Sequence, residues 1–158
     1  ISNDGKIILH IGNFSDEKNH DFLIDVFAEI LKRDRNVFLI LIGDGVLFNS
    51  IVAKVFALKL QFNVKFLGTQ KDVSKFLLIS ELIVLTSKIE GVPGVLLEAA
   101  YFKVPSVSTN VGGVKEFVIH DETGLLIDQF EVNLFADSIL SLIDNDERRR
   151  KLGMNAYK

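Results

Sequence analysis

The sequence predicts an α/β domain in which a parallel β-sheet is covered by helices on both faces. Short runs rich in Ile, Val, Leu and Phe alternate with longer segments of helical periodicity along nearly the whole chain. Most of the short runs are continuously apolar, which is typical of strands that are buried on both faces. Strand–helix–strand repeats of this kind favour a doubly wound, Rossmann-like sheet with right-handed crossovers.

About six strands are expected in this sheet. The apolar runs that predict them are 6–12, 37–43, 64–68, 82–87, 105–109 and 124–128. Six strands with six or seven helices use the whole length of 158 residues. We therefore expect a single domain over residues 1–158, with no room for a second.

The segments between the strands carry the apolar stripes of helices. The stripe in segment 20–33 consists of Phe22, Val26, Phe27, Ile30 and Leu31, and the stripe in segment 49–61 consists of Ile51, Val52, Val55, Leu58 and Leu60. A further helix is expected from about residue 93 to residue 102. The C-terminal segment 132–158 is interpreted as two helices that separate near residues 144–146.

Composition and charge exclude several classes of protein. The sequence has no cysteine, which excludes disulfides, thiolate metal sites and cysteine nucleophiles. The net charge of −3 indicates no nucleic-acid partner, and the basic cluster 148–151 is interpreted as a solvated helix face. No apolar run reaches the roughly 18 residues that a transmembrane helix needs.

The three histidines, His10, His20 and His120, show no metal-ligand spacing and are interpreted as structural. His20 lies at a predicted helix start. A capping or surface role is favoured there over a contact with phosphate.

Ligands of open parallel sheets bind beyond the carboxyl ends of the strands, so a motif for ligand binding is expected in the loops at those ends. Loop 12–19 has neither the G-x-G-x-x-G pattern of dinucleotide sites nor a Walker A lysine. Gly43 and Gly45 are interpreted as a tight turn. No G-x-S-x-G nucleophile motif is present. An NAD-type domain is therefore disfavoured.

The loop after the fourth predicted strand differs, because it carries two glutamates in an otherwise apolar stretch, KIEGVPGVLLEAA. Gly91, Pro93 and Gly94 argue against one continuous helix between these glutamates. Pro93 suits the first helical position, where its missing N–H is not needed. We therefore expect Glu90 on a loop and Glu98 inside the following helix.

Two interpretations of Glu98 remain open. A charged, unpaired carboxylate buried among apolar side chains costs several kcal/mol, so Glu98 faces either water or a ligand cleft. If Glu90 and Glu98 both line a cleft, they can accept sugar or ribose hydroxyls, while the adjacent helix N-terminus suits a phosphate. A nucleotide sugar carries sugar hydroxyls on both sides of a diphosphate and would use all of these groups.

From about residue 6 to residue 128 the sequence resembles the C-terminal, donor-binding domain of the retaining group 1 glycosyltransferases, which have the two-domain GT-B fold. The most specific stretch is EGVPGVLLEAAYFKVPSVSTNVGGVKEFV, followed by DETGLLID. It is similar to the family's E-x7-E motif, its Gly-Gly pair, a glutamate and a Thr-Gly pair. The matching residues are Glu90 and Glu98, Gly112 and Gly113, Glu116, and Thr123 and Gly124.

The resemblance implies roles for individual residues. Glu90 would contact hydroxyls of the donor sugar, and Glu98 would hold the ribose hydroxyls. Lys18 would neutralise the diphosphate, so Glu90 and Lys18 are the expected catalytic residues. Backbone N–H groups at Gly94, Val95 and Leu96 would meet the sugar and the diphosphate.

Gly12 and Asn13, at the end of the first predicted strand, complete the expected donor site. The family often has an arginine directly after this glycine, and Asn13 brings no charge there. Losing a charge-assisted hydrogen bond would cost about 1.5–3 kcal/mol. Either the loop is slightly offset, or this subfamily does without the charge, or the donor site is weakened.

The resemblance also implies a reaction. The family passes a sugar from a nucleotide-diphosphate donor to an acceptor hydroxyl with retention at the anomeric carbon, as in polysaccharide or glycoconjugate biosynthesis. The loops after the strands carry no Asp-x-Asp motif, so neither a metal ion nor another cofactor is expected. We expect a cytoplasmic protein, free or peripheral at a membrane.

The chain begins at Ile1 and soon enters a predicted strand, so we expect a piece of a longer protein without its N-terminal acceptor domain. That domain would bind an acceptor glycan or lipid-linked glycan across the interdomain cleft. This chain alone is expected to bind donor weakly and not to turn over. A non-catalytic nucleotide- or sugar-binding module and a structural α/β interaction domain remain alternatives.

Overall fold

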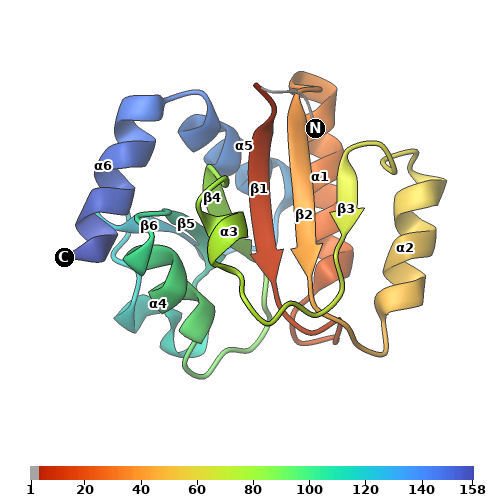
Figure 1. Cartoon of the computed structure of the whole chain (residues 1–158), viewed down its shortest axis with the longest axis horizontal. Helices are drawn as coiled ribbons and strands as arrows, with labels where there is room; N and C mark the ends of the chain where they lie inside the picture. The colour runs from red at the N-terminus through yellow and green to blue at the C-terminus, as the bar shows by residue number, and fades with distance from the viewer. Residues whose placement is uncertain (1–3) are drawn as a thin grey trace.

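The computed structural model describes residues 4–158, which form a six-stranded sheet whose neighbouring strands are all parallel (Figure 1). The strand order is β3-β2-β1-β4-β5-β6. The strands are β1 (Lys6–Ile11), β2 (Val37–Ile42), β3 (Val64–Phe66), β4 (Leu82–Leu85), β5 (Ser106–Thr109) and β6 (Gly124–Ile127). All six predicted strands are confirmed, and their ends differ from the expected ones by two residues at most.

The helices follow the strands in the order expected of a doubly wound fold. They are α1 (His20–Arg33), α2 (Phe48–Ala57), α3 (Ser74–Leu77), α4 (Gly94–Tyr101), the 3-10 helix η1 (Gly112–Glu116), α5 (Val132–Ile143) and α6 (Asp146–Tyr157). The predicted break between the two C-terminal helices is confirmed.

The sheet separates two apolar layers. Side chains that alternate along a strand enter opposite layers, so Ile8 packs in one while Ile7 and Leu9 pack in the other. Helices α1, α2, α5 and α6 contribute to the layer of Ile8, and α3 and α4 contribute to the layer of Leu9. Figure 1 shows α3 and α4 on the near side of the sheet and α1 and α5 on the far side. The Rossmann-like fold class is confirmed.

Helix α2 ends earlier than the stripe in segment 49–61 predicts. Lys59 has a left-handed backbone with φ 59°, and the Leu60 N–H donates to the Val55 carbonyl at 2.9 Å, as in a Schellman C-cap. Leu58 is consequently exposed, while Leu60 is buried beyond the helix. The expectation that both belong to one helical stripe is wrong, because the C-cap turns the chain before them.

Helix α4 begins at Gly94, and Pro93 is its N-cap with ψ 81°. Pro93 therefore precedes the first helical residue instead of occupying that position, which corrects the expected start by one residue. Glu90 lies on the preceding loop and Glu98 within the helix, as expected.

The order of the strands brings β1 and β4 side by side at the centre of the sheet. The chain leaves β1 toward α1 on one face and leaves β4 toward α4 on the other face. The carboxyl ends of β1 and β4, at the lower edge in Figure 1, are therefore the topological switch point at which ligands of such sheets bind.

Candidate functional site

Two loops from the switch point are tied together. The Thr86 hydroxyl, at the end of β4, lies 3.2 Å from the carbonyl oxygens of both Lys18 and Asn19. The Lys88 N–H donates to the Glu17 carbonyl at 2.7 Å. These bonds fix the loop after β1 against the loop after β4, so side chains far apart in the sequence meet here.

Lys18 and Glu90 form an ion pair between these loops. The Lys18 Nζ lies 2.6 Å from Glu90 Oε1, and the Glu90 side chain is only 6% exposed. The Ser87 hydroxyl donates to the same Oε1, also at 2.6 Å. Within residues 4–158 no donor contacts the other oxygen, Oε2. The carboxylate is therefore held by one oxygen and has its second oxygen available for a hydroxyl.

The Lys18 ammonium also keeps capacity for a second partner. It has three N–H donors, and one of them is directed at Glu90. The lysine stem passes beside Gly12, where a Cβ would lie at an ordinary contact distance of 3.5 Å from the Lys18 side chain and at a tighter 3.3 Å from His10 Nε2. An anion beside this ammonium would meet its two remaining N–H donors, while the Glu90 carboxylate offsets part of its positive charge.

The Gly112–Gly113 pair supports the loop that carries Glu90. Gly112 has φ 51°, and a Cβ at this position would lie 1.8 Å from the Glu90 carbonyl oxygen. A Cβ on Gly113 would lie 2.4 Å from the carbonyl oxygen of Gly91. The pair is required because η1 begins in direct contact with the backbone of this loop. The Gly-Gly motif thus acts on the site by placing Glu90.

The three amides at the start of α4 are not equally free. The Gly94 N–H donates to the Val92 carbonyl at 2.9 Å, and the Leu96 N–H donates to the Pro93 carbonyl at 2.9 Å. The Val95 N–H makes no hydrogen bond in the described part of the chain. The space beside Gly94 is open, since a Cβ there would have no atom within 4 Å. Val95 is consequently the amide best placed to donate to a ligand.

Glu98 lies on the exposed side of α4, whereas Leu96 and Ala99 are buried against the sheet. Its carboxylate has no hydrogen bond or ion pair within residues 4–158. The desolvation cost that made this glutamate unusual in the sequence therefore does not arise. Its assignment to ribose hydroxyls stays a prediction.

Asn13 is exposed at the end of β1, and its carbonyl accepts a hydrogen bond from the Ser15 N–H at 2.8 Å. Its side-chain amide makes no hydrogen bond to the described residues. The structure therefore places an uncharged, unrestrained side chain where an arginine was expected from the family pattern.

Comparison with known proteins assigns this chain and its fold to a family. The family model described as "Glycosyl transferases group 1" matches residues 1–158. The chain belongs to the group 1 glycosyltransferases. The solved structures that it resembles have the same fold, among them a crystal structure of the C-terminal domain of a group 1 family protein, LpcC from Francisella tularensis. That protein is 23% identical, with a TM-score of 0.86 over 96% of this chain and 82% of that one.

Relatives with named activities match across the same region. The N-acetyl-alpha-D-glucosaminyl L-malate synthase of Bacillus anthracis is 36% identical over 99% of this chain and 41% of its own length. TarM of S. aureus is 30% identical, with a TM-score of 0.92 over 97% of this chain and 31% of that chain, and its crystal structure contains UDP. Anabaena HepE, solved with UDP and glucose, is 26% identical, with a TM-score of 0.89 over 97% of this chain and 43% of that chain. This group 1 chain thus spans about two fifths of the length of the curated relatives it matches.

Two buried histidines beneath the site of this group 1 domain were not identified from the sequence. The His10 Nδ1 lies 2.8 Å from the Val84 carbonyl, and the His20 ring stacks on Phe14 with centroids 4.0 Å apart. His10 Nε2 and both nitrogens of His20 have no partner within residues 4–158. The capping or surface role favoured for His20 is wrong, because its ring is buried between Phe14 and His10.

Burial sets the charge of both rings. It lowers the pKa of His10 to about 4, although the hydrogen bond to Val84 acts in the opposite direction. The pKa of His20 is lowered further, by burial and by its neighbours His10 and Lys18. Both rings are therefore neutral near pH 7 and add no charge beside the Lys18–Glu90 pair.

Ser87 is the other residue whose contribution was missed. A Thr-Ser pair at the end of a continuously apolar strand is the signal that could have found it, because buried hydroxyls need partners. Thr86 binds the loop after β1, as described above, and Ser87 binds Glu90. The Ser87 carbonyl in turn accepts from the Thr109 hydroxyl at 2.7 Å, so β5 also supports the site.

No group of three or more His, Asp or Glu side chains in residues 4–158 could hold a metal ion. The sequence does contain one Asp-x-Asp pattern, at Asp144 and Asp146, outside the loops that follow the strands. Asp144 pairs with Lys6 at 3.4 Å and Asp146 pairs with Arg149 at 2.8 Å. Metal independence stays a prediction. None of the helices described has the length and apolar character needed to cross a bilayer.

Proposed function

We propose that this chain is the donor-binding part of a retaining glycosyltransferase that moves a sugar from a nucleotide-diphosphate sugar to an acceptor hydroxyl. The observation that carries the proposal is the Glu90 carboxylate, held through Oε1 by Lys18 and Ser87, with Oε2 directed at no other residue in the part described. It lies at the β1/β4 switch point, where a ligand of this fold binds.

In the proposed chemistry, different residues of this chain bind the three parts of the donor, which are the diphosphate, the sugar and the ribose. Lys18 stabilises the negative charge that grows on the diphosphate as the bond to the anomeric carbon breaks, and the Val95 N–H adds a second donor. Glu90 Oε2 accepts a hydroxyl of the donor sugar and orients its ring. Glu98 accepts the ribose hydroxyls. The proposed donor site is also lined by Gly12, Asn13, Gly94 and Leu96. No metal ion takes part in this proposal.

Uridine diphosphate is the nucleotide to test first. TarM and HepE were both solved with UDP, and their sequences are 30% and 26% identical to this chain. The named relatives include N-acetylglucosaminyl and other hexosyl transferases, such as the poly(ribitol-phosphate) alpha-N-acetylglucosaminyltransferase of Staphylococcus aureus, 31% identical. A UDP-linked hexose or N-acetylhexosamine is therefore the proposed donor class.

The acceptor belongs to the remainder of the protein in this proposal. The chain matches about two fifths of the length of its relatives, so an N-terminal domain within the remaining three fifths would supply the acceptor site for a glycan or lipid-linked glycan. Residues 1–158 alone are then a donor-binding domain that binds weakly and does not turn over. Sugar transfer by the isolated 158-residue chain would refute this part.

The proposal is tested by calorimetric titration of the chain with UDP-, GDP- and ADP-sugars. Glu98→Ala is expected to weaken binding of the preferred donor about tenfold, which corresponds to about 1.4 kcal/mol. Glu147→Ala is the matched control, because it removes an equally exposed carboxylate from α6. Equal affinities in the two variants would remove Glu98 from the site. Absence of binding by every nucleotide at millimolar concentration would favour a structural interaction domain instead.

Asn13 favours a second candidate, a nucleotide- or sugar-binding module without catalysis, because the position lacks the charge that the family often places there. Asn13→Arg tests whether this position contacts the diphosphate. If the diphosphate passes this position, the variant binds UDP about tenfold more tightly through a charge-assisted contact. An unchanged affinity would show that the loop is offset from the diphosphate.

A further inference from the structure

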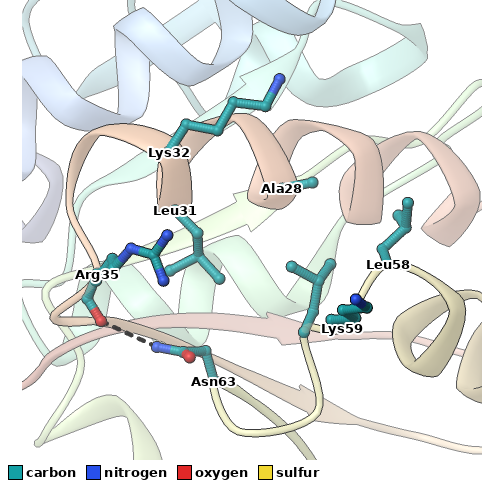
Figure 2. Close-up of a pocket in the computed structure, with 8 residues that line it drawn as sticks. Ala28, Leu31, Lys32, Arg35, Leu58, Lys59 and Asn63 are labelled. Atoms are coloured by element: carbon teal, nitrogen blue, oxygen red, sulfur yellow. Dashed lines mark hydrogen bonds between the residues drawn. The ribbon is translucent and has the colours of Figure 1, made fainter.

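A cavity of about 440 Å³ lies at the opposite end of the sheet from the Lys18–Glu90 pair. It is formed between the C-terminal end of α1 and the segment that connects α2 to β3 (Figure 2). Its lining residues are Ala28, Leu31, Lys32, Arg35, Leu58, Lys59, Leu60 and Asn63. We call it the amino-edge cavity, because it adjoins the amino ends of β2 and β3. A volume of this size is within the range of small-molecule sites.

The amino-edge cavity has two kinds of wall. Ala28 and Leu31 of α1, with Leu58 and Leu60 after α2, form an apolar floor. Arg35 and Lys59 lie on opposite sides of this floor, and the Arg35 guanidinium is beside Leu31 (Figure 2). An apolar body could occupy the floor while an anionic group reaches both cations.

The two cations are not neutralised by the protein. Within residues 4–158, neither the Arg35 nor the Lys59 side chain has a hydrogen bond or ion pair, and both are exposed. Lys32 behaves differently, since it pairs with Glu29 at 2.7 Å and points away from the cavity in Figure 2. Arg35 and Lys59 are therefore two cations without an ionic partner in the described part of a chain whose net charge is −3.

The cavity is built from fixed backbone. The Asn63 side-chain amide donates to the carbonyl oxygens of Arg35 at 3.1 Å and Val37 at 2.9 Å, which joins the two sides of the cavity. Lys59 is held at the left-handed position of the α2 C-cap, with φ 59°. Glycine is the residue usually favoured at such a position, so the lysine is placed there against local preference. Ligand binding would not have to order these segments.

We propose that the amino-edge cavity is a binding site for an amphiphilic anion, an acyl or other apolar body that carries one phosphate or carboxylate. The anionic group binds between Arg35 and Lys59, and the apolar body lies on Leu31, Leu58 and Leu60. The site is independent of the proposed donor site. Strand β2 has six residues and separates the two by roughly 20 Å.

Such an anion has two sources, a free metabolite and the headgroup region of a lipid. Phe56 and Phe62 are 60% and 76% exposed and flank the cavity segment in the sequence, so a bilayer would contact them too. A soluble amphiphile bound in the cavity requires neither phenylalanine. A monomeric probe and a vesicle therefore separate the two sources.

The test is an NMR titration of the isotope-labelled 158-residue chain with octyl phosphate below its micelle concentration. Saturable one-to-one binding is expected, with the largest amide shifts in residues 28–35 and 58–63. Inorganic phosphate lacks the apolar body and octyl glucoside lacks the charge, so each is expected to bind at least tenfold more weakly. Shifts spread over the whole surface, or equal binding of all three probes, would overturn the proposal.

Charge reversal at the site provides the decisive variant. Arg35→Glu combined with Lys59→Glu is expected to weaken octyl phosphate binding at least tenfold without changing the thermal midpoint by more than a few degrees. Lys151→Glu combined with Lys158→Glu has the same net charge and is expected to bind normally, since both lysines are exposed elsewhere. Equal losses in the two double variants would overturn the proposal.

Phosphatidylglycerol vesicles form the last arm of the test. Vesicle binding that is lost in the Arg35/Lys59 variant and in Phe62→Ser identifies a lipid as the source. Binding of the monomeric probe without any binding to vesicles identifies a free anion as the source. Vesicle binding without any binding of the monomeric probe would overturn the cavity as the site. UDP is expected not to compete with octyl phosphate, whatever the outcome of the donor titration.

Discussion

The two ends of the sheet differ in whether their charged side chains are buried and paired. At the carboxyl end, Lys18 and Ser87 both bind one oxygen of Glu90, and the glutamate side chain is almost fully buried. At the amino end, Arg35 and Lys59 are exposed and have no partner in the described part of the chain. A buried charge needs a partner within the protein because desolvation is costly, whereas an exposed charge does not.

This difference indicates what each end can contribute to binding. The carboxyl end offers preoriented groups whose geometry is fixed before any ligand arrives, which suits a reaction that must position a donor. The amino end offers positive charge beside an apolar floor, which suits affinity for an anion with little demand on geometry. Four predictions test whether burial and mutual pairing really distinguish the two ends.

The largest effect of a single substitution is expected at the contact beneath Glu90. Gly112→Ala places a Cβ 1.8 Å from the Glu90 carbonyl oxygen in a left-handed residue, and the neighbour is backbone. Overpacking and left-handed strain together are expected to lower the free energy of unfolding by about 3 kcal/mol. Urea denaturation measures this. Gly91→Ala is the matched control, because a Cβ there meets nothing within 4 Å. Similar losses in both variants would show that the contact is not rigid.

A lower pH is expected to destabilise the folded chain, because two histidines are buried at the carboxyl end of the sheet. In the unfolded chain both rings take up protons below about pH 6.5. In the folded chain His10 does so only near pH 4, and His20 at still lower pH. The unfolded state therefore binds more protons between these values, and folding stability falls as the pH is lowered. From pH 7 to pH 5 the loss is about 2 kcal/mol for each ring.

Thermal denaturation between pH 7 and pH 5 measures the slope of folding stability against pH. His20→Leu, which keeps an apolar side chain of similar size beside Phe14, is expected to halve it. Arg35→Glu with Lys59→Glu at the amino end is expected to leave it unchanged, since no buried histidine lies there in the part described. If the Arg35/Lys59 variant changed the slope of stability against pH, the assignment of this slope to His10 and His20 would be contradicted.

The sequence was sufficient for the sheet but only partly for the site. Continuous apolar runs located every strand, because a strand buried on both faces leaves no other pattern. The family motif identified Lys18 and Glu90, which the fold brings to 2.6 Å. The shared use of Oε1 by Ser87 could not be predicted, since it depends on side-chain direction at the end of β4. The amino-edge cavity depends on the backbone of Lys59, where residue type gave no sign of a left-handed turn.

A double-mutant cycle measures how strongly the buried pair is coupled. Lys18→Met leaves Glu90 with Ser87 as its partner in a nearly dry environment, so a loss of about 1–3 kcal/mol in unfolding free energy is expected. Glu90→Gln in the same background is expected to restore part of that loss, because a neutral amide is less costly to bury. The resulting coupling energy should be about 2 kcal/mol. A coupling near zero would mean that water screens the pair.

The smallest effect is expected for a second ion pair between the same two loops. Lys88 Nζ lies 2.7 Å from an oxygen of Asp16, but the side chains are 44% and 83% exposed. The coupling energy of Lys88→Met with Asp16→Asn should be about 0.5 kcal/mol or less and should vanish in 1 M salt. This pair shares its loops and its distance with Lys18–Glu90, so burial is the main difference between them. If the two coupling energies proved equal, burial would not set the strength of ion pairs at the carboxyl end. The contrast with Arg35 and Lys59 would then need a cause other than burial.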